Sequence, residues 1–298
     1  MNGSVFVTGG SGFIGRNLVE ALGDEYDILA PSHAELELLD EEAVAAYLNR
    51  HRVEVVVHCA VRPGHRAARD PSQQLQRNLR MFAALARCRE RYRRLIFVSS
   101  GAVYDARHSE PRLPEIAFGR HVPVDELGFS KYLCAAYAAT RPDIVELRPF
   151  GVFGPYEDSG IRFISNAICR TLLDLPVRLR QNRRFDYVPV GDLVGVIERF
   201  FICEARHDAY NVSAERTWEL LDLARLVVGL SGKDLPIVVA HEGLGSEYSG
   251  DGGRLRDELP DFAFTPIADA VTRLYQWYEE RRDSIDRAAL LADETRQP

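Results

Sequence analysis

The stretch Ser4-Val5-Phe6-Val7-Thr8-Gly9-Gly10-Ser11-Gly12-Phe13-Ile14-Gly15-Arg16 decides the fold of this chain. An apolar, β-branched run from Ser4 to Val7 predicts a strand, and the glycines that follow predict a tight turn. Apolar residues at helical spacing from Phe13 to Leu22 then predict a helix. A strand, a glycine turn and a helix N-terminus in this order are typical of a site for the diphosphate of a dinucleotide.

The three spaced glycines of this turn each have a predicted role. Gly9 can adopt the positive φ that the turn requires, and Gly12 lets the backbone approach a pyrophosphate. Gly15 allows the helix to pack closely on the strand. The free N–H groups and the positive end of the helix dipole then face the phosphates.

Length and composition are those of an ordinary globular protein. The chain has 298 residues, of which 46% are hydrophobic and 27% charged, and its net charge is −7. This length suits one large α/β domain or two interleaved ones. The negative charge argues against nucleic acid or an anionic membrane as the main partner. No apolar run is long enough to span a membrane, and the first strand begins too early for a signal peptide, so we expect a cytoplasmic protein.

Cysteine and histidine spacing predicts neither disulfides nor a metal site. The eight histidines show no metal-ligand spacing. The five cysteines are scattered among apolar residues without a C-x-x-C pair, which predicts buried free thiols in a reducing compartment. They are Cys59, Cys88, Cys134, Cys169 and Cys203.

The second strand is expected near residues 26–30, and its carboxyl end meets the adenosine ribose in folds of this type. An acid at this point binds the 2′-hydroxyl of NAD, but residues 31–33 are Pro-Ser-His. The missing carboxylate favours NADP over NAD, with Arg16 and His33 as contacts of the 2′-phosphate. Glu37 either reaches the adenine edge or is an exposed loop acid, and the sequence leaves both open.

The run Val53–Ala60 predicts a buried strand of a parallel sheet covered on both faces. Cys59, Ala60 and Val61 stand at its carboxyl end, where ligands bind in open α/β sheets. The basic loop at 62–66 either meets phosphates or is a solvated loop.

Four further segments continue the alternation of strands and helices. They are Val98–Tyr104, Arg148–Pro155, Phe185–Val194 and Tyr210–Val212. With the glycine turn, they make the chain resemble the extended short-chain dehydrogenase/reductases, the NAD(P)-dependent epimerase/dehydratase group that works mostly on nucleotide sugars. The resemblance covers nearly the whole chain. It implies an α/β fold: a doubly wound parallel Rossmann sheet with a smaller C-terminal substrate lobe.

The resemblance also implies which residues form the site. The active-site serine of the family falls at Ser100 and its lysine at Lys131, and the segment with Pro149 and Val152 passes under the nicotinamide. The implied cofactor-binding residues are Gly9, Gly12, Phe13, Ile14, Gly15, Arg16, His33, Glu37, Leu38, Cys59, Ala60, Val61, Lys131, Pro149 and Val152. Members of this family often pair through two helices per subunit, which implies a homodimer.

The Tyr-x-x-x-Lys motif of the family is altered. Its spacing puts both side chains on one helix face, where lysine lowers the pKa of the tyrosine and tyrosine exchanges a proton with the substrate oxygen as hydride moves. Here Leu127 occupies the tyrosine position. Tyr132 is no simple substitute, because one residue along a helix turns the side chain about 100° away. Leu127 leaves three alternatives: another group donates the proton, the reaction does not need this proton transfer, or the site has lost redox chemistry. Candidates for a displaced acid are Tyr104, Tyr187, Glu126 and a bound water.

Two more departures concern the substrate. Nucleotide-sugar members commonly hold the diphosphate with arginines, but Phe185 stands at one of these positions and, in a loose alignment, His241 at the other. Neither makes bidentate guanidinium contacts. Arg183 and Arg184 lie just upstream of Phe185, and candidates to replace the missing contacts are Arg162, Arg184, Arg254 and Arg256. The alternative is a substrate without a nucleoside diphosphate, but we favour a nucleotide sugar.

The resemblance further implies interleaved domains. Residues 1–155 plus about 185–213 would form the Rossmann domain, and about 156–184 plus 214–298 the substrate lobe. Helices are expected around 163–168, from Thr217, and from Ile267 to Tyr278. The glycine- and serine-rich segment 243–253 predicts a mobile loop near the substrate or a loose linker.

Two functions remain in competition. The first is an NAD(P)-dependent oxidoreductase or epimerase acting on a nucleotide-activated sugar, at C4 of the sugar. The second is a repurposed protein that binds NAD(P) with non-redox or lost activity. A hydrolase using Ser100 is disfavoured because no G-x-S-x-G elbow or suitable histidine accompanies that serine.

Overall fold

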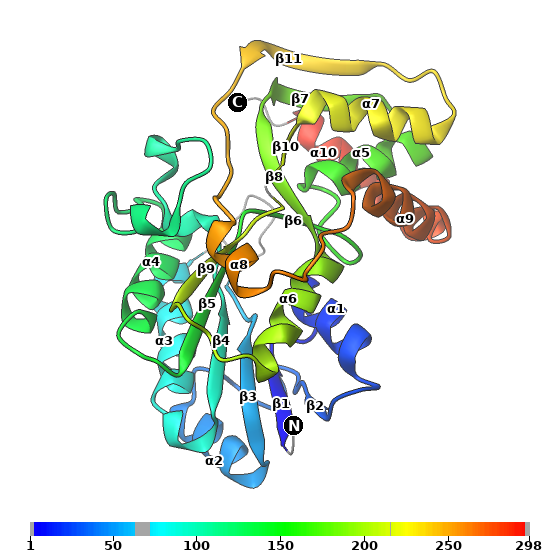
Figure 1. The fold of residues 1–298 in the computed structure, drawn as a ribbon. Coiled ribbons are helices and arrows are strands. Elements are labelled where there is room, and N and C mark those ends of the chain that lie inside the picture. Colours follow the sequence, from blue (N-terminus) through cyan, green and yellow to red (C-terminus); the bar gives the residue numbers. More distant parts are fainter. Residues whose placement is uncertain (1–2, 63–71, 215, 296–298) are drawn as a thin grey trace.

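The computed structural model describes residues 3–62, 72–214 and 216–295. A six-stranded parallel sheet forms its centre, in the order β2-β1-β3-β4-β5-β9 (Figure 1). The strands are β1 (Ser4–Thr8), β2 (Ile28–Leu29), β3 (Val53–His58), β4 (Arg94–Val98), β5 (Ile144–Pro149) and β9 (Ala209–Val212). The doubly wound α/β fold is therefore confirmed.

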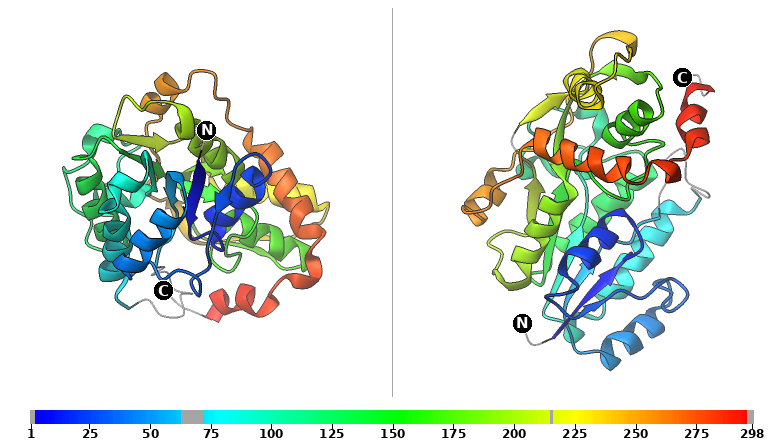
Figure 2. Two further views of the ribbon diagram at one scale, coloured as in Figure 1. Left: turned by 90° about the horizontal axis from the view of Figure 1, so that it is seen from below. Right: turned by 90° about the vertical axis from the view of Figure 1, so that its right-hand side faces the viewer.

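Helices cover both faces of this sheet (Figures 1 and 2). One face carries α1 (Phe13–Leu22) and α6 (Val190–Ile202), and the other carries α2 (Glu41–Arg50), α3 (Gln74–Ala86) and α4 (Glu126–Ala138). The strands are apolar on both sides because each face packs on its own cluster: Val5 and Val57 point to α1 and α6, and Phe6 and Val56 to the other face.

A second apolar core lies beyond the carboxyl ends of the strands (Figure 1). It is built from α5 (Phe163–Leu172), α7 (Leu220–Ser231), α9 (Ile267–Glu279), α10 (Arg287–Thr295) and the parallel pair β7 (Val177–Asn182) and β11 (Ile237–Leu244). A three-stranded sheet connects the two cores: β10 (Thr217–Glu219), β8 (Arg184–Pro189) and β6 (Gly151–Phe153). The remaining helices are α8 (Gly253–Glu258) and single 3₁₀ turns at Arg89–Arg91, Gly101–Val103, Ala106–His108, Glu115–Ala117 and Arg282–Ser284.

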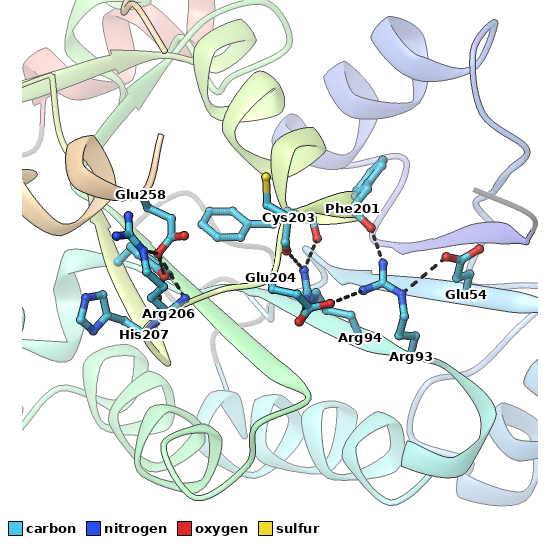
Figure 3. A network of polar contacts seen from close by, with 11 residues as sticks. Glu54, Arg93, Arg94, Phe201, Cys203, Glu204, Arg206, His207 and Glu258 are labelled. Atoms are coloured by element: carbon cyan, nitrogen blue, oxygen red, sulfur yellow. Dashed lines mark hydrogen bonds and ion pairs between the residues drawn. The ribbon is translucent and has the colours of Figure 1, made fainter. Parts of the chain in front are cut away.

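Arg93 and Arg94, where β4 begins, bind backbone carbonyls at the carboxyl end of α6 (Figure 3). Arg93 donates to the Phe201 carbonyl. Arg94 is only 4% exposed and donates to the carbonyl oxygens of Phe200, at 2.9 Å, and Cys203. Its guanidinium also pairs with Glu204 at 2.9 Å. The last carbonyls of a helix have no partner within the helix, so Arg94 caps α6 and fixes it against the sheet.

Several local expectations need correction. The helix expected from Thr217 begins only at Leu220, because Thr217–Glu219 pair with β8 as strand β10. The segment expected to be a mobile loop or loose linker is held by backbone hydrogen bonds: Tyr248 N–H donates to the Arg184 carbonyl and Asp251 N–H to the Leu113 carbonyl, both at 2.9 Å. All five cysteines are free, but Cys59 and Cys203 are only partly buried.

Across the described residues, no helix has the length and apolar character needed to cross a membrane.

Candidate functional site

A cavity of about 570 Å³ lies at the carboxyl ends of β1 and β3. The chain turns from β1 toward β2 on one side and places β3 on the other, so this is the switch point where open α/β sheets bind ligands. The structure brings together eleven of the expected cofactor residues in its lining: Gly9, Gly12, Phe13, Ile14, Gly15, His33, Glu37, Leu38, Cys59, Ala60 and Val61.

The glycine turn fits the diphosphate of a dinucleotide. Gly9 has a φ of 71°, and a Cβ there would lie 2.8 Å from the backbone nitrogen of Ala60. A Cβ at Gly15 would lie 2.2 Å from the carbonyl oxygen of Gly9. No side chain caps α1 at Gly12, so the N-terminal N–H groups of the helix face the cavity.

The other end of the cavity suits an adenosine. Glu37 lines it, paired with His33 at 3.4 Å, and accepts a hydrogen bond from the Leu39 N–H at 2.9 Å. Arg16 is outside the lining: its guanidinium lies 3.7 Å from the centre of the Tyr156 ring and pairs with Glu20. A contact between Arg16 and a 2′-phosphate therefore needs this side chain to move.

The basic loop expected after β3 falls mostly outside the described residues. Its first residue, Arg62, lines the cavity. The Arg62 N–H donates to Asn78 Oδ1 at 2.7 Å, and Asn78 Nδ2 donates to Ser130 Oγ at 3.3 Å. Asn78, on α3, thus joins the cavity wall to the helix that carries Lys131.

The residues expected around the nicotinamide lie beside the cavity, not in its lining. Lys131 is 8% exposed, its Nζ donates to the Val98 carbonyl at 2.9 Å, and burial lowers its pKa. Ser100 follows β4, and its Oγ accepts from the Ala102 N–H at 3.1 Å. Pro149 ends β5 and Val152 lies in β6.

Three of the side chains considered as a displaced acid have other surroundings. Tyr104 is buried; its hydroxyl donates to Asn211 Oδ1 at 2.9 Å and accepts from Arg148 at 3.1 Å. Tyr187 stacks on Phe185, 5.6 Å between ring centres. Glu126 is exposed in the first turn of α4. None of the contacts of these three side chains among the described residues involves Ser100.

Tyr248, which sequence reasoning missed, does lie beside Ser100: its phenolic oxygen would be 2.7 Å from a Cβ on the adjacent Gly101, and the Ser100 hydroxyl lowers the pKa of the phenol. Its ring lies 5.0 Å from the Phe150 ring and 5.8 Å from the Phe185 ring. Phe185, which stands where the resemblance implies an arginine, thus belongs to an aromatic cluster beside the serine. The only signal in the sequence was a single aromatic residue within a glycine- and serine-rich segment.

The candidate phosphate-binding arginines are mostly engaged elsewhere. Arg183 donates to Ser246 Oγ at 2.6 Å, Arg184 pairs with Glu219 at 3.1 Å, and Arg254 faces Glu115 at 3.7 Å. His241 is exposed on β11 and Arg256 lies in α8. Arg162, by contrast, lines the cavity.

Glu157 is a second cavity residue that the sequence did not reveal. It is 7% exposed, and one carboxyl oxygen accepts a hydrogen bond from Ser165 while Oε2 has no partner among the described residues. Burial raises its pKa to about 8, against the opposing effect of Ser165 and Arg162. Glu157 is therefore largely uncharged near neutral pH.

Comparison with known proteins gives the family of this chain. The sequence profile of the NAD dependent epimerase/dehydratase family matches residues 5–213. The chain belongs to this family. The matched range includes the glycine turn, Ser100, Leu127 and Lys131.

Relatives of this epimerase/dehydratase chain carry names of sugar-nucleotide enzymes. It is 32% identical to a dTDP-4-keto-6-deoxy-D-glucose reductase of Streptomyces niveus over 76% of this chain and 78% of the relative. It is 25% identical to a UDP-glucose 4-epimerase of Bacillus subtilis, over 78% and 84% respectively. Its fold matches a GDP-mannoheptose C4 reductase from Campylobacter jejuni, solved with NADP bound, with a TM-score of 0.81 at 15% identity, covering 93% of this chain and 98% of the other.

Proposed function

We propose that this protein is an NAD(P)-dependent oxidoreductase or epimerase that acts at C4 of a nucleotide-activated sugar. The observation that carries the proposal is the cavity at the switch point, with the glycine turn at one wall and Ser100 and Lys131 beside it. The names of the relatives supply the substrate class.

Different residues of the cavity would bind different parts of the cofactor. The turn from Gly9 to Gly15 and the N-terminus of α1 would hold the diphosphate, and His33, Glu37 and Leu38 the adenosine. The nicotinamide, when bound, supplies or accepts a hydride. Lys131, a buried donor, would hold the nicotinamide ribose, and Ser100 would orient a substrate oxygen by hydrogen bonding.

Both NADP and NAD remain candidate cofactors, with NADP slightly ahead because no acid directly follows β2. Glu37 works in the opposite direction, since a carboxylate in this part of the lining would repel a 2′-phosphate. The imidazole of His33 lies 3.4 Å from that carboxylate. The ratio of the two dissociation constants decides the question.

Two observations favour a second candidate function. Leu127 cannot exchange a proton, and the aromatic cluster around Phe185 offers no guanidinium to a diphosphate. A protein that keeps the cofactor for a non-redox task, or that accepts a substrate without a nucleoside diphosphate, would account for both.

Turnover assays separate these functions. Purified protein is mixed with NADPH or NADH and with dTDP-4-keto-6-deoxyglucose, and separately with NAD⁺ or NADP⁺ and UDP-glucose. Loss of NADPH absorbance, or appearance of the C4 epimer, supports the proposed function. Saturable cofactor binding without turnover of any sugar supports the second candidate.

A further inference from the structure

We propose that Tyr248 is the catalytic acid of this enzyme: its phenol, held against Ser100, delivers the proton to the substrate oxygen that Leu127 cannot deliver. This inference rests on the proposed function. Its starting point is the position of the phenol beside Ser100 and Gly101, at the carboxyl end of β4. A Cβ placed on Gly101, the residue after Ser100, would lie only 2.7 Å from the phenolic oxygen. The phenol therefore occupies the space that this glycine leaves open.

The main chain holds Tyr248 in this position. Its N–H donates to the Arg184 carbonyl at 2.9 Å, and its carbonyl accepts from the Asp186 N–H at 3.0 Å. The segment thus runs as an extra parallel pairing along β8, which orients the ring toward β4. Hydrogen bonds on both sides of one residue restrict the backbone more than an ordinary loop does, as positioning of a catalytic group requires.

The ring itself is fixed by aromatic neighbours. Phe150 and Phe185 lie 5.0 and 5.8 Å from it, at interplanar angles of 57° and 61°. Gly250 allows this packing, because a Cβ there would lie 2.2 Å from the Phe150 ring. The replacement of a family arginine by Phe185 then has a local reason, since Phe185 forms one wall around the phenol.

The surroundings of the phenol keep it protonated. Burial raises the pKa of Tyr248 to about 12, with Asp186 acting in the same direction and Ser100 and Arg162 against it. At neutral pH the group is therefore protonated. Lys131 is not among the charges that lower its pKa; it is bound to the Val98 carbonyl instead.

The carbonyl carbon of the sugar gains a hydride with its electron pair from the reduced nicotinamide, and the displaced C=O pair moves onto the oxygen. The O–H bond of Tyr248 breaks and its proton bonds to that oxygen. The phenolate regains a proton from water through the Ser100 hydroxyl. Ketone becomes alcohol, and the cofactor is oxidised by two electrons.

The first test does not depend on turnover. 3-Fluorotyrosine is placed at position 248, and separately at the exposed Tyr137 as a control. The ¹⁹F resonance at 248 is expected to shift when NADP⁺ is added, while the resonance at 137 stays in place. A fixed 248 resonance in protein that demonstrably binds NADP⁺ would overturn the inference but leave the proposed function standing. Absence of NADP⁺ and NAD⁺ binding would overturn both.

The second test measures the chemical step with dTDP-4-keto-6-deoxyglucose and NADPH. Tyr248→Phe is expected to lower kcat by about 10²-fold or more while KM and the NADPH dissociation constant are unchanged. Tyr137→Phe is the control for a neutral phenol-to-phenyl change. If Tyr248→Phe keeps full kcat, or if Tyr187→Phe abolishes kcat instead, Tyr248 is not the acid. A parallel rise in KM and loss of thermal stability would identify a structural role.

Discussion

The phenolic oxygen of Tyr248 lies beside Ser100, 2.7 Å from where a Cβ on Gly101 would be, so the segment after β11 meets the end of β4. This arrangement places a phenol beside the serine, while α4 carries Leu127 at the position where the resemblance implies a tyrosine. We propose that the acid stands not on the helix that bears Lys131 but on the segment after β11.

Restoring the family residue tests this relocation. Leu127→Tyr is expected to leave kcat for keto-sugar reduction essentially unchanged, because Tyr248 already supplies the proton. The measurement is steady-state NADPH oxidation by the variant and the parent protein. A gain in kcat of about 10²-fold, the usual worth of a general acid, would mean that the site is a degenerate one lacking its acid.

The glycine turn makes a prediction about cofactor affinity. Gly15→Ala brings a Cβ to 2.2 Å from the Gly9 carbonyl oxygen, so it must displace the turn. We expect NADPH binding, followed by fluorescence titration, to weaken by at least about tenfold. Gly229→Ala is the matched control: it lies in α7 with no atom within 4 Å of the new Cβ, and a stabilisation of about 0.5–1 kcal/mol is expected. Equal affinities in both variants would contradict the assigned site.

Glu157 predicts a specific pH dependence of stability. Its folded-state pKa of about 8 lies above the ordinary value of 4.5, so the folded protein binds the additional proton. Its contribution to the free energy of unfolding is complete below pH 4.5 and is lost as the pH rises through about 8, at up to about 1.4 kcal/mol per pH unit.

Glu157→Gln removes this titration. The measurement is thermal unfolding of both proteins between pH 6 and 9. The Tm of the variant is expected to increase relative to that of the parent protein as the pH rises. Parallel Tm profiles would show that the carboxyl group is ionised in the folded protein throughout, with Arg162 outweighing Asp158 and burial.

The cap of α6 predicts that loss of Arg94 lowers the free energy of unfolding far more than loss of its ion-pair partner Glu204. Arg94→Met leaves the carbonyls of Phe200 and Cys203 without their donor, and we expect a loss of about 3 kcal/mol in the free energy of unfolding. Glu204→Gln breaks the same ion pair, but its side chain is 87% exposed, so less than about 1 kcal/mol is expected. Urea denaturation of the two variants checks this; similar losses would disprove the capping role.

Most of the fold was predictable because its signals are local. The apolar runs that became β1, β3 and β4, and the apolar stripe that became α9, each identify their own element. The glycine turn was predictable for the same reason, since its steric requirements act within a few residues. The start of α7 was missed because β8 recruits Thr217–Glu219 as a strand, a tertiary effect with no signal inside that segment.

The proposed catalytic side of the site was only partly predictable. Motifs indicated Ser100 and Lys131 as candidates, but Tyr248 approaches Ser100 from a segment whose composition favours a loop. Its position depends on pairing with β8 and on the space beside Gly101, both set by the folded chain. The pKa of Glu157 depends likewise on burial, which no spacing rule gives.

The central claim is that a nicotinamide dinucleotide binds in the cavity at the glycine turn. The most direct measurement is to release and identify the nucleotide that co-purifies with the protein, then to titrate the stripped protein with NADPH and NADH. We predict bound NADP or NAD, or saturable binding of at least one reduced form, weakened in Gly15→Ala. Stripped protein that binds neither NADPH nor NADH would contradict the account.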